Sequence, residues 1–318
     1  MAGIWIFAEN REQTLELLNA GRNLAQDFKA KVVTFALNVH LAEEYINHGS
    51  DEVLLLPLLG QDQSLESYVP VIAEVARQED PDVFFIGGTQ RGREIAARVA
   101  ARLNTGLCGG CTGYKVDQKN KLLLMNRMIL GGAAVQTVVC TTRPQMAVIP
   151  PRTFEQAPLM EGRQGKVIEL PAAQPSAVKV INRTPKVQES VDLTEAKIIV
   201  SVGRGMEKKE DLSLALELAG VLGGEVGCSR PVAEELHWLP EERYMGISGK
   251  KVKPDLYIGL GVSGQIQHIT GIRDSKIIFG INRDENAPIF EAADYGIVGD
   301  LYEVVPKLIK ELKVLLKK

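Results

Sequence analysis

The sequence predicts an α/β protein with two domains, each a mainly parallel sheet flanked by helices. Apolar β-type runs alternate with amphipathic helical segments twice, once before Gly106 and again after Ala196. The 318 residues are also enough for two domains of ordinary size, each with its own buried core.

The first alternation fills the N-terminal third of the chain. Strands are predicted at Ile4–Ala8, Val32–Leu37, Val53–Leu56 and Val83–Ile86, and helices at Leu15–Phe28, Leu65–Arg77 with Ser64 as N-cap, and Glu94–Leu103. Further β runs follow at Leu122–Arg127, Val135–Thr141 and Met146–Ile149. Polar or glycine-rich turns separate them, so we interpret them as antiparallel additions that complete the first sheet.

A long connection follows the double proline Pro150-Pro151. Residues 155–195 are rich in Pro, Gln, Glu and Lys and contain two short β-like runs, Val167–Leu170 and Val178–Ile181. We therefore predict an N-terminal domain over residues 1–190 and a C-terminal domain over 191–318, with the boundary near Glu189–Glu195.

The second alternation has the same character. Strands are predicted at Lys197–Val202, Val226–Cys228, Leu256–Leu260, Lys276–Ile281 and Tyr295–Val298. Helices are predicted at Leu212–Leu222 and Val304–Leu316, and a further helix is predicted to follow the glycine turn that ends at Gly264. Polar residues follow the strand ends: Arg204, Ser229, Arg230, Ser263, Asn282 and Asp300. Ligands of open parallel sheets bind beyond the carboxyl ends of strands, so this convergence indicates a nucleotide-type cofactor in the second domain.

A glycine motif opens the helix after the third of these strands. Gly259, Gly261 and Gly264 match G-x-G-x-x-G, a turn that brings pyrophosphate close to backbone N–H groups. The helix start is unusually polar, with Ser263, Gln265, Gln267 and His268. The alternative interpretation is a strand–turn–helix unit that needs glycine only for close packing. The alternative for Arg204 and Arg230 is that each is a surface arginine paired with a nearby Glu.

Composition and cysteine spacing limit the functional classes. Hydrophobic residues make up 45%, charged residues 24%, and the net charge is −3, so neither nucleic-acid binding nor membrane insertion is predicted. The N-terminus carries no signal-peptide pattern, and four cysteines favour a reducing, cytoplasmic compartment. Cys108-Gly-Gly-Cys111 has redox or half-zinc spacing, but no second pair or nearby histidine completes a metal site, so we interpret both as turn cysteines and predict no metal.

The second domain resembles the α subunit of electron-transfer flavoproteins (the FixB family). The resemblance is carried over about 120 residues by Val202–Gly205, Gly227–Pro231, Gly246–Lys250, Pro254–Tyr257, Ser263–His268, Asp274–Lys276, Ile281-Asn282, Ala287–Phe290 and Ala293–Leu301. The first domain resembles the family more loosely, through its strand order and the Gly87-Gly88-Thr89 turn before a helix.

The resemblance implies a non-covalent FAD in a Rossmann-like second domain. It places Arg230 over the isoalloxazine ring, Ser248 near N5 and His268 near the O2 carbonyl. The other implied cofactor-binding residues are Arg204, Ser229, Met245, Gly246, Ile247, Ser263, Gly264, Gln265, Ile266, Gln267, Asn282, Asp300 and Leu301. Ile247 and Gln265 depart from the common pattern of the family, and Ser248 keeps a hydroxyl where many members have Thr. A guanidinium and an imidazole beside N1–C2=O2 stabilise the negative charge that reduction puts there.

The resemblance also implies partners. The chain would form a heterodimer with a β subunit and carry electrons from an acyl-CoA dehydrogenase, or another flavin dehydrogenase, to a quinone oxidoreductase or ferredoxin. It would be a redox carrier without catalytic residues of its own, and its second domain a mobile head hinged near residues 189–195. A bifurcating version has a second FAD, in place of AMP, in the β subunit and oxidises NADH.

Two other functions stay open from the residues alone. A nicotinamide-linked dehydrogenase would use Gly259–Gly264, and needs an acidic residue near the end of the next strand, where this chain has Asn282 and then Asp284. A non-redox nucleotide-binding module would need only the fold. A flavin absorption spectrum separates the carrier from both.

Overall fold

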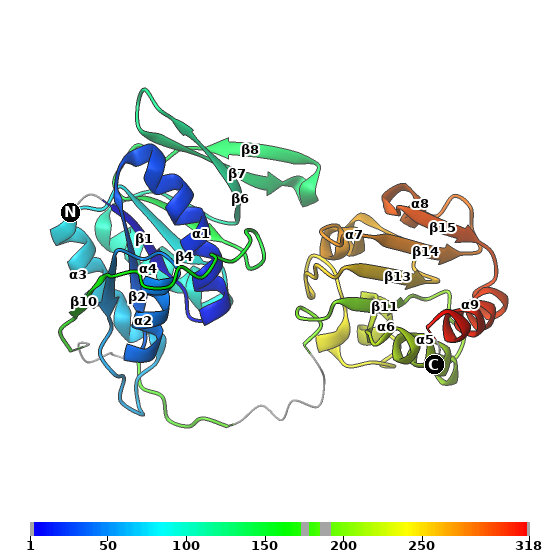
Figure 1. Ribbon diagram of the computed structural model, residues 1–318. Coiled ribbons are helices and arrows are strands. Elements are labelled where there is room, and N and C mark those ends of the chain that lie inside the picture. Colours follow the sequence, from blue (N-terminus) through cyan, green and yellow to red (C-terminus); the bar gives the residue numbers. More distant parts are fainter. Residues whose placement is uncertain (1–2, 173–177, 185–191, 317–318) are drawn as a thin grey trace. The chain divides into compact units, whose positions relative to one another are not determined.

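The computed structural model describes residues 3–172, 178–184 and 192–316, and the chain divides into two compact units, Met1–Thr184 and Pro185–Lys318 (Figure 1). The predicted boundary at 190/191, and the first part of the hinge predicted at 189–195, lie outside the described residues. Each unit contains its own parallel sheet, in agreement with the predicted two-domain α/β class.

Unit 1, Met1–Thr184, is built on a seven-stranded sheet in the order β10-β3-β2-β1-β4-β9-β5. Its strands are β1 (Gly3–Phe7), β2 (Lys31–Ala36), β3 (Glu52–Leu55), β4 (Val83–Gly87), β5 (Leu107–Cys108), β9 (Gln145–Ile149) and β10 (Lys166–Glu169). All neighbouring strands are parallel. Nearly every residue of β1, β2, β4 and β9 is buried because helices cover both faces of the sheet.

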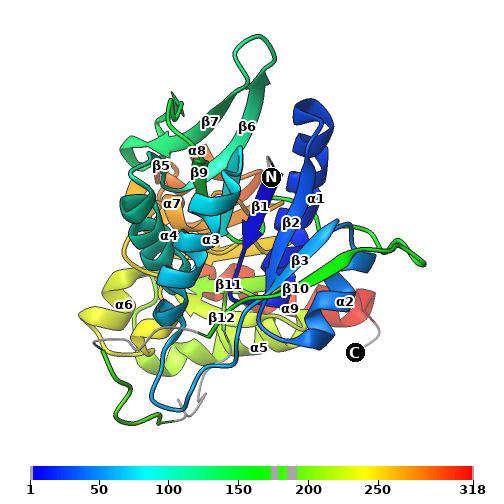
Figure 2. The same cartoon turned by 90° about the vertical axis from the view of Figure 1, so that its left-hand side faces the viewer.

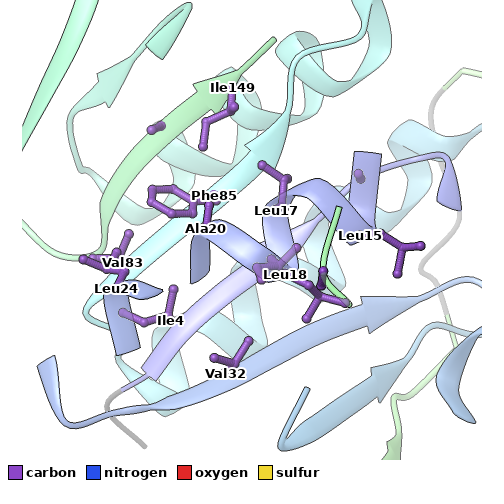
Figure 3. Close-up of a cluster of buried hydrophobic side chains, with 14 of the residues drawn as sticks. Ile4, Leu15, Leu17, Leu18, Ala20, Leu24, Val32, Val83, Phe85 and Ile149 are labelled. Carbon is purple, nitrogen blue, oxygen red and sulfur yellow. The ribbon is translucent and has the colours of Figure 1, made fainter. Parts of the chain in front are cut away.

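Four helices form the outer layers of unit 1: α1 (Arg11–Phe28), α2 (Val39–Asn47), α3 (Val69–Glu79) and α4 (Gln90–Leu103). Helices α1 and α2 pack on one face, where Leu15, Leu18 and Leu24 meet Ile4 and Phe85 (Figure 3). Helices α3 and α4 pack on the other face around an aromatic cluster of Trp5, Phe35 and Phe84. The side chain of Asn10 accepts a hydrogen bond from the Gln13 amide and so begins α1.

A second, separate sheet in unit 1 corrects one prediction. Strands β6 (Cys111–Asp117), β7 (Leu122–Ile129) and β8 (Ala134–Val138) form a three-stranded antiparallel sheet, in which β6 and β7 project from the parallel sheet (Figure 2). The prediction that these runs complete the first sheet was wrong. The predicted run at Met146–Ile149, part of β9, does join the first sheet, but parallel to β4, because the long crossover from β4 to β9 permits that direction.

The side chain of Gln145 explains how the small sheet is attached. Its Oε1 accepts a hydrogen bond from the Leu123 amide at 2.7 Å, and its Nε2 donates to the Lys121 carbonyl at 3.1 Å. One buried side chain on β9 therefore anchors the start of β7. Such a side-chain bridge leaves no periodic signal in the sequence.

Two smaller predictions also differ from the structure, and one helix was not predicted. No strand forms at Val178–Ile181 in the described residues 178–184. The helix predicted at Leu65–Arg77 begins as a 3₁₀ turn over Leu65–Tyr68, and its predicted N-cap Ser64 makes no side-chain capping bond. Helix α2 was not predicted, because it has only nine residues, too few for a clear amphipathic pattern.

Unit 2, Pro185–Lys318, contains a five-stranded parallel sheet in the order β12-β11-β13-β14-β15. Its strands are β11 (Ile198–Val202), β12 (Glu225–Cys228), β13 (Leu256–Leu260), β14 (Ile278–Asn282) and β15 (Tyr295–Val298). In order of sequence this is 2-1-3-4-5, the flavodoxin-like variant of the doubly wound fold, whose ligand crevice lies between the first and third strands. The crevice of unit 2 is therefore expected beyond the ends of β11 and β13.

Helices cover both faces of this sheet. Helices α5 (Leu212–Leu222), α6 (Arg230–Glu234) and α9 (Leu301–Leu315) pack on one face, and α7 (Ile266–Ile272) and α8 (Ile289–Ala292) contribute to the core on the other. The predicted bounds of α5, β13 and β15 agree with the structure. In the described part of the chain, no helix is long and apolar enough to cross a membrane.

Candidate cofactor site

A cavity of about 800 Å³ opens at the carboxyl ends of the strands in unit 2. The loops after all five strands and the segment Tyr244–Ser248 line it. Every site residue predicted from the sequence lines this cavity except Gly264 and Ile266. The residues that line it without having been predicted include Gly205, Glu207, Pro231, Tyr244, Arg283, Asp284, Pro288 and Tyr302. The predicted residues that line the cavity, which are spread along the sequence from Arg204 to Leu301, are thus brought together in the fold.

Backbone hydrogen bonds beyond the strand ends hold the lining loops side by side. The Gly203 amide donates to the Leu260 carbonyl at 2.9 Å, and the Gly205 amide donates to the Gly261 carbonyl at 3.0 Å. The Gly299 amide donates to the Asn282 carbonyl at 3.0 Å. The sheet's ladder is therefore continued into the loops, which fixes the floor of the cavity.

Two glycines of the predicted motif are required by geometry. Gly261 has φ +61°, and a Cβ there would lie 2.7 Å from the Cα of Gly205. Gly264 has φ +80°, and a Cβ there would lie 2.2 Å from the amide nitrogen of Ile289. Both positions exclude L side chains, by conformation and by contact. Gly264 thus shapes the turn from behind, which explains why it does not line the cavity.

The glycine motif differs in position from a dinucleotide fingerprint. That fingerprint lies in the first βα turn of a doubly wound sheet, whereas Gly259–Gly264 follows β13, the third strand of unit 2. The helix that follows, α7, has only seven residues. The motif therefore gives little support to the nicotinamide-linked alternative.

The two predicted arginines reach the cavity from exposed positions. Arg230 Nε donates to Glu234 Oε2 at 2.5 Å, one turn along α6, and Arg204 Nη1 lies 3.8 Å from Glu235 Oε2. The two side chains are 63% and 68% exposed. Both guanidinium groups are thus exposed and paired with a nearby glutamate, as in the alternative interpretation of these arginines, and solvent screens their charge.

His268 is the buried polar group of the site. Its Nε2 lies 2.7 Å from the hydroxyl of Tyr257, which is fully buried on β13. Burial lowers the pKa of His268 to about 4, and a weak contact with the Met245 backbone opposes this only in part. Its Nδ1 is buried without a hydrogen-bond partner of normal geometry among the described residues. The imidazole is therefore neutral at physiological pH and has one unused polar atom.

The segment Met245–Ser248 forms the wall beside α7. The Ile247 amide donates to the Gln267 carbonyl at 2.9 Å, which ties the wall to the start of α7. The Tyr244 hydroxyl donates to the Ser248 carbonyl at 3.0 Å. The Ile247 and Ser248 side chains are both exposed within this wall, and Met245 is buried beneath it.

Other predicted residues have structural contacts besides their place in the cavity. Asn282 Nδ2 donates to the Val262 carbonyl at 2.9 Å, which joins the loop after β13 to the end of β14. Asp300 caps α9 by accepting a hydrogen bond from the Tyr302 amide at 2.8 Å. Leu301 is part of the core below. Their presence at strand ends therefore has a folding cause as well as a possible ligand role.

Comparison with known proteins places this architecture in a family. The electron transfer flavoprotein domain model matches residues 4–175, and the electron transfer flavoprotein FAD-binding domain model matches residues 192–273. Protein FixB of Clostridium saccharobutylicum is 41% identical over 98% of this chain and 96% of its own length. The chain belongs to the α-subunit (FixB) family of electron transfer flavoproteins. Two further relatives agree with this.

The electron transfer flavoprotein α subunits of Thermoanaerobacterium thermosaccharolyticum and Clostridium acetobutylicum are 40% and 37% identical to this chain. Each alignment covers 98% of this chain, and 98% and 97% of the respective relative. As an electron transfer flavoprotein α chain, the protein carries its two family domains in its two units, and the cavity lies in the unit that the FAD-binding model matches.

Proposed function

We propose that this chain is the α subunit of a heterodimeric electron transfer flavoprotein and binds one FAD non-covalently in the cavity of unit 2. The observation that carries the proposal is the convergence of the family's cofactor residues on one cavity at the switch point of the sheet. The position of the cavity alone would suit any nucleotide-type ligand, and membership of the family favours a flavin.

The residues present fit FAD in size and in chemistry. A cavity of about 800 Å³ falls within the range of roughly 300–1,000 Å³ for small-molecule sites. Among the described residues, Nδ1 of His268 is a buried polar atom without a hydrogen bond of normal geometry, and a bound polar group would offset its desolvation. Arg204 and Arg230 provide cationic groups for phosphate or for a ring that gains negative charge.

In this proposal different parts of the cavity would contact different parts of FAD. Arg230, Ser248 and His268 would face the isoalloxazine ring, and the loops after β11, β13, β14 and β15 would hold the ribityl, pyrophosphate and adenosine parts. The bound flavin supplies the redox chemistry, because its ring accepts and releases electrons singly or in pairs. The protein residues bind and orient the ring, and Arg230 places fixed positive charge at the pocket.

The neutral state of His268 has a consequence for the ring. A neutral imidazole stabilises negative charge only as a hydrogen-bond donor, whereas an imidazolium adds a full charge. If Tyr257 donates to Nε2, the imidazole proton is on Nδ1, which makes no hydrogen bond of normal geometry within the described part of the chain. The Tyr257–His268 pair would thus present one N–H donor to a carbonyl oxygen of the flavin.

For partners, we propose the β subunit of the heterodimer, an acyl-CoA dehydrogenase or another flavin dehydrogenase as donor, and a quinone oxidoreductase or ferredoxin as acceptor. All four cysteines are free thiols, which supports a reducing compartment such as the cytoplasm. Rotation of unit 2 about the connection between the units would let one flavin serve both donor and acceptor.

The flavin count of the purified αβ complex tests the proposal. One FAD with one AMP per complex is expected for a simple carrier, and two FAD with NADH-dependent reduction for a bifurcating complex. A complex that contains no flavin, or FMN only, would contradict the proposal in either form. A complex reduced by a nicotinamide cofactor without any flavin would favour the dehydrogenase alternative.

A further inference from the structure

A pair of cysteines in unit 1 lies far in sequence from the cofactor site and has no role in it. Cys108 ends β5 and Cys111 begins β6, with Gly109 and Gly110 as the only residues between them. β5 belongs to the seven-stranded parallel sheet and β6 to the three-stranded antiparallel sheet. The Cys-Gly-Gly-Cys turn is therefore one of the two direct chain connections between the sheets of unit 1, the other being residues 139–144 between β8 and β9.

The turn brings the two thiols together. Residues at the first and fourth positions of a tight turn have Cα atoms within about 7 Å, and disulfides span Cα separations of roughly 4.4–6.8 Å. The two thiols are close enough that each is the largest influence on the pKa of the other. The backbone thus already holds the two sulfur atoms on the same side of the turn, and closing the bond needs little movement of the chain.

Charge near the pair favours one thiolate. Arg127 on β7 lies directly opposite Cys111 in the β6–β7 register. Its Nε is buried without a hydrogen-bond partner among the described residues, and its positive charge acts on Cys108. The neighbouring Cys111 thiol, and then this guanidinium, lower the pKa of Cys108, whereas the pKa of Cys111 is raised. We therefore expect Cys108 to act as the nucleophile of the pair, an assignment that the variants below test.

The other two cysteines lack these features. Burial raises the pKa of Cys228 to about 12, and it also raises the pKa of Cys140. Cys140 packs against Gly106, two residues before Cys108, and the charge of Cys108 raises the pKa of Cys140, so it is the natural competitor for Cys108. Among the described residues no group of three or more metal-binding side chains is assembled, so a redox role suits the pair better than a metal.

We propose that Cys108 and Cys111 form a reversible dithiol–disulfide site that links the two sheets of unit 1. With a peroxide as the oxidant, the Cys108 thiolate attacks one peroxide oxygen, the S–O bond forms, and the O–O bond breaks. The leaving hydroxide takes a proton and becomes water. The sulfur of Cys111 then displaces the hydroxyl from Cys108, and its thiol proton leaves with that hydroxyl as the second water. Two electrons pass from the thiols to the peroxide.

The position of the turn determines how an oxidant could reach the two thiols and what a disulfide between them would do. A Cβ at Gly109 or Gly110 would meet nothing within 4 Å, so there is open space beside both glycines, which are partly exposed above the two buried thiols. A small oxidant can therefore approach from the turn side. The disulfide would close a four-residue ring at the junction, and thereby restrict movement of the three-stranded sheet relative to the parallel sheet.

The test is thiol mapping on the full-length chain in its αβ complex. The complex is treated with a few-fold excess of hydrogen peroxide, alkylated under denaturing conditions, digested and analysed by mass spectrometry. We expect a peptide containing both Cys108 and Cys111 that is two hydrogens lighter and takes up alkylating reagent only after reduction with dithiothreitol. Cys228 is expected to stay fully alkylatable under the same treatment.

Variants assign the two roles. In Cys111→Ser, Cys108 should give a sulfenic acid that dimedone traps, and in Cys108→Ser, Cys111 should oxidise at least about tenfold more slowly than Cys108 does in the wild type. Arg127→Gln should slow disulfide formation several-fold, and Cys140→Ser, the matched control, should leave it unchanged. The wild-type map decides even if a variant fails to fold. A Cys108–Cys140 disulfide, or irreversible oxidation of both thiols without a disulfide, would overturn the proposal.

Discussion

The hydroxyl of Tyr257 lies 2.7 Å from Nε2 of His268, and both side chains are buried beneath the cofactor cavity. Tyr257 comes from β13 and His268 from α7, so the contact joins the strand to the helix that follows the glycine turn. The phenol, whose pKa burial raises, stays protonated at physiological pH. This neutral pair fixes the orientation of the imidazole before any ligand binds.

Removing the Tyr257 hydroxyl should leave a buried nitrogen of His268 without its partner. We expect Tyr257→Phe to lower the free energy of unfolding by about 1–3 kcal/mol, measured by urea denaturation. The imidazole signals in NMR spectra should also show a mixture of tautomers in place of one. The control is Tyr114→Phe, which removes the bond from that hydroxyl to the Ala20 carbonyl in unit 1 and should leave the His268 tautomer unchanged.

The stability of unit 2 should depend on pH through His268. Its pKa is about 4 in the folded protein and about 6.5 when unfolded, so the unfolded chain binds more protons as the pH falls below 6.5. The contribution of neutral His268 to the free energy of unfolding is therefore fully present above pH 6.5 and is lost as the pH falls towards 4. Between pH 7.5 and pH 5 we expect a loss of about 2 kcal/mol from this group. His268→Gln should remove that part of the pH dependence, and an unchanged slope would contradict the assignment.

Two glycine-to-alanine substitutions, one in the turn that shapes the cavity and one in a helix, test the role of that turn. Gly264→Ala places a side chain at φ +80° and against the backbone of Ile289, so we expect a loss of about 2–5 kcal/mol and of bound flavin. Gly220→Ala is the matched control in α5, where a Cβ would meet nothing, and it should be neutral or stabilise by up to about 1 kcal/mol. Equal effects of the two changes on unfolding would argue against a special role for Gly264.

Arg230 should raise the potential of the first one-electron reduction of bound flavin. Arg230→Ala is expected to lower that midpoint potential because it removes a fixed positive charge that lines the cavity. The exposure of the Arg230 side chain and its pairing with Glu234 limit the effect. We therefore expect the midpoint potential to fall by about 20 mV or more, but by less than about 100 mV. Spectroelectrochemistry measures it, with Lys276→Ala, an exposed cation paired with Asp255 outside the cavity, as control.

The sequence predicted most of this site because its signals are local. Each polar residue that follows a strand, such as Arg204 after β11 or Asn282 at the end of β14, can be recognised from the run of apolar residues before it. Parallel strands end at one edge, so convergence follows from topology alone. The sequence allowed pairing of the two arginines with a nearby Glu, but it could not single out Glu234 and Glu235, because an ion pair of this kind has no distinctive pattern.

The errors in the fold have a common cause. Short β runs such as Leu122–Arg127 carry no information on which sheet they join, and here a buried Gln145 side chain decides it. The strand pattern of β9 is likewise the same for parallel and antiparallel pairing, and only the long crossover favours the parallel one. The Tyr257–His268 contact was also unpredictable, because it depends on the path of the glycine turn between the two residues.

The most direct test of the central claim is flavin release from the αβ complex carrying wild-type or altered α chain. The complex is purified, denatured with acid, and the released nucleotides are separated and counted by chromatography. The account predicts one FAD per wild-type α chain, released without breaking a covalent bond, and one fewer FAD per complex when the α chain carries Gly264→Ala. An FAD count that is the same for both complexes, or the absence of FAD from the wild type, would contradict it.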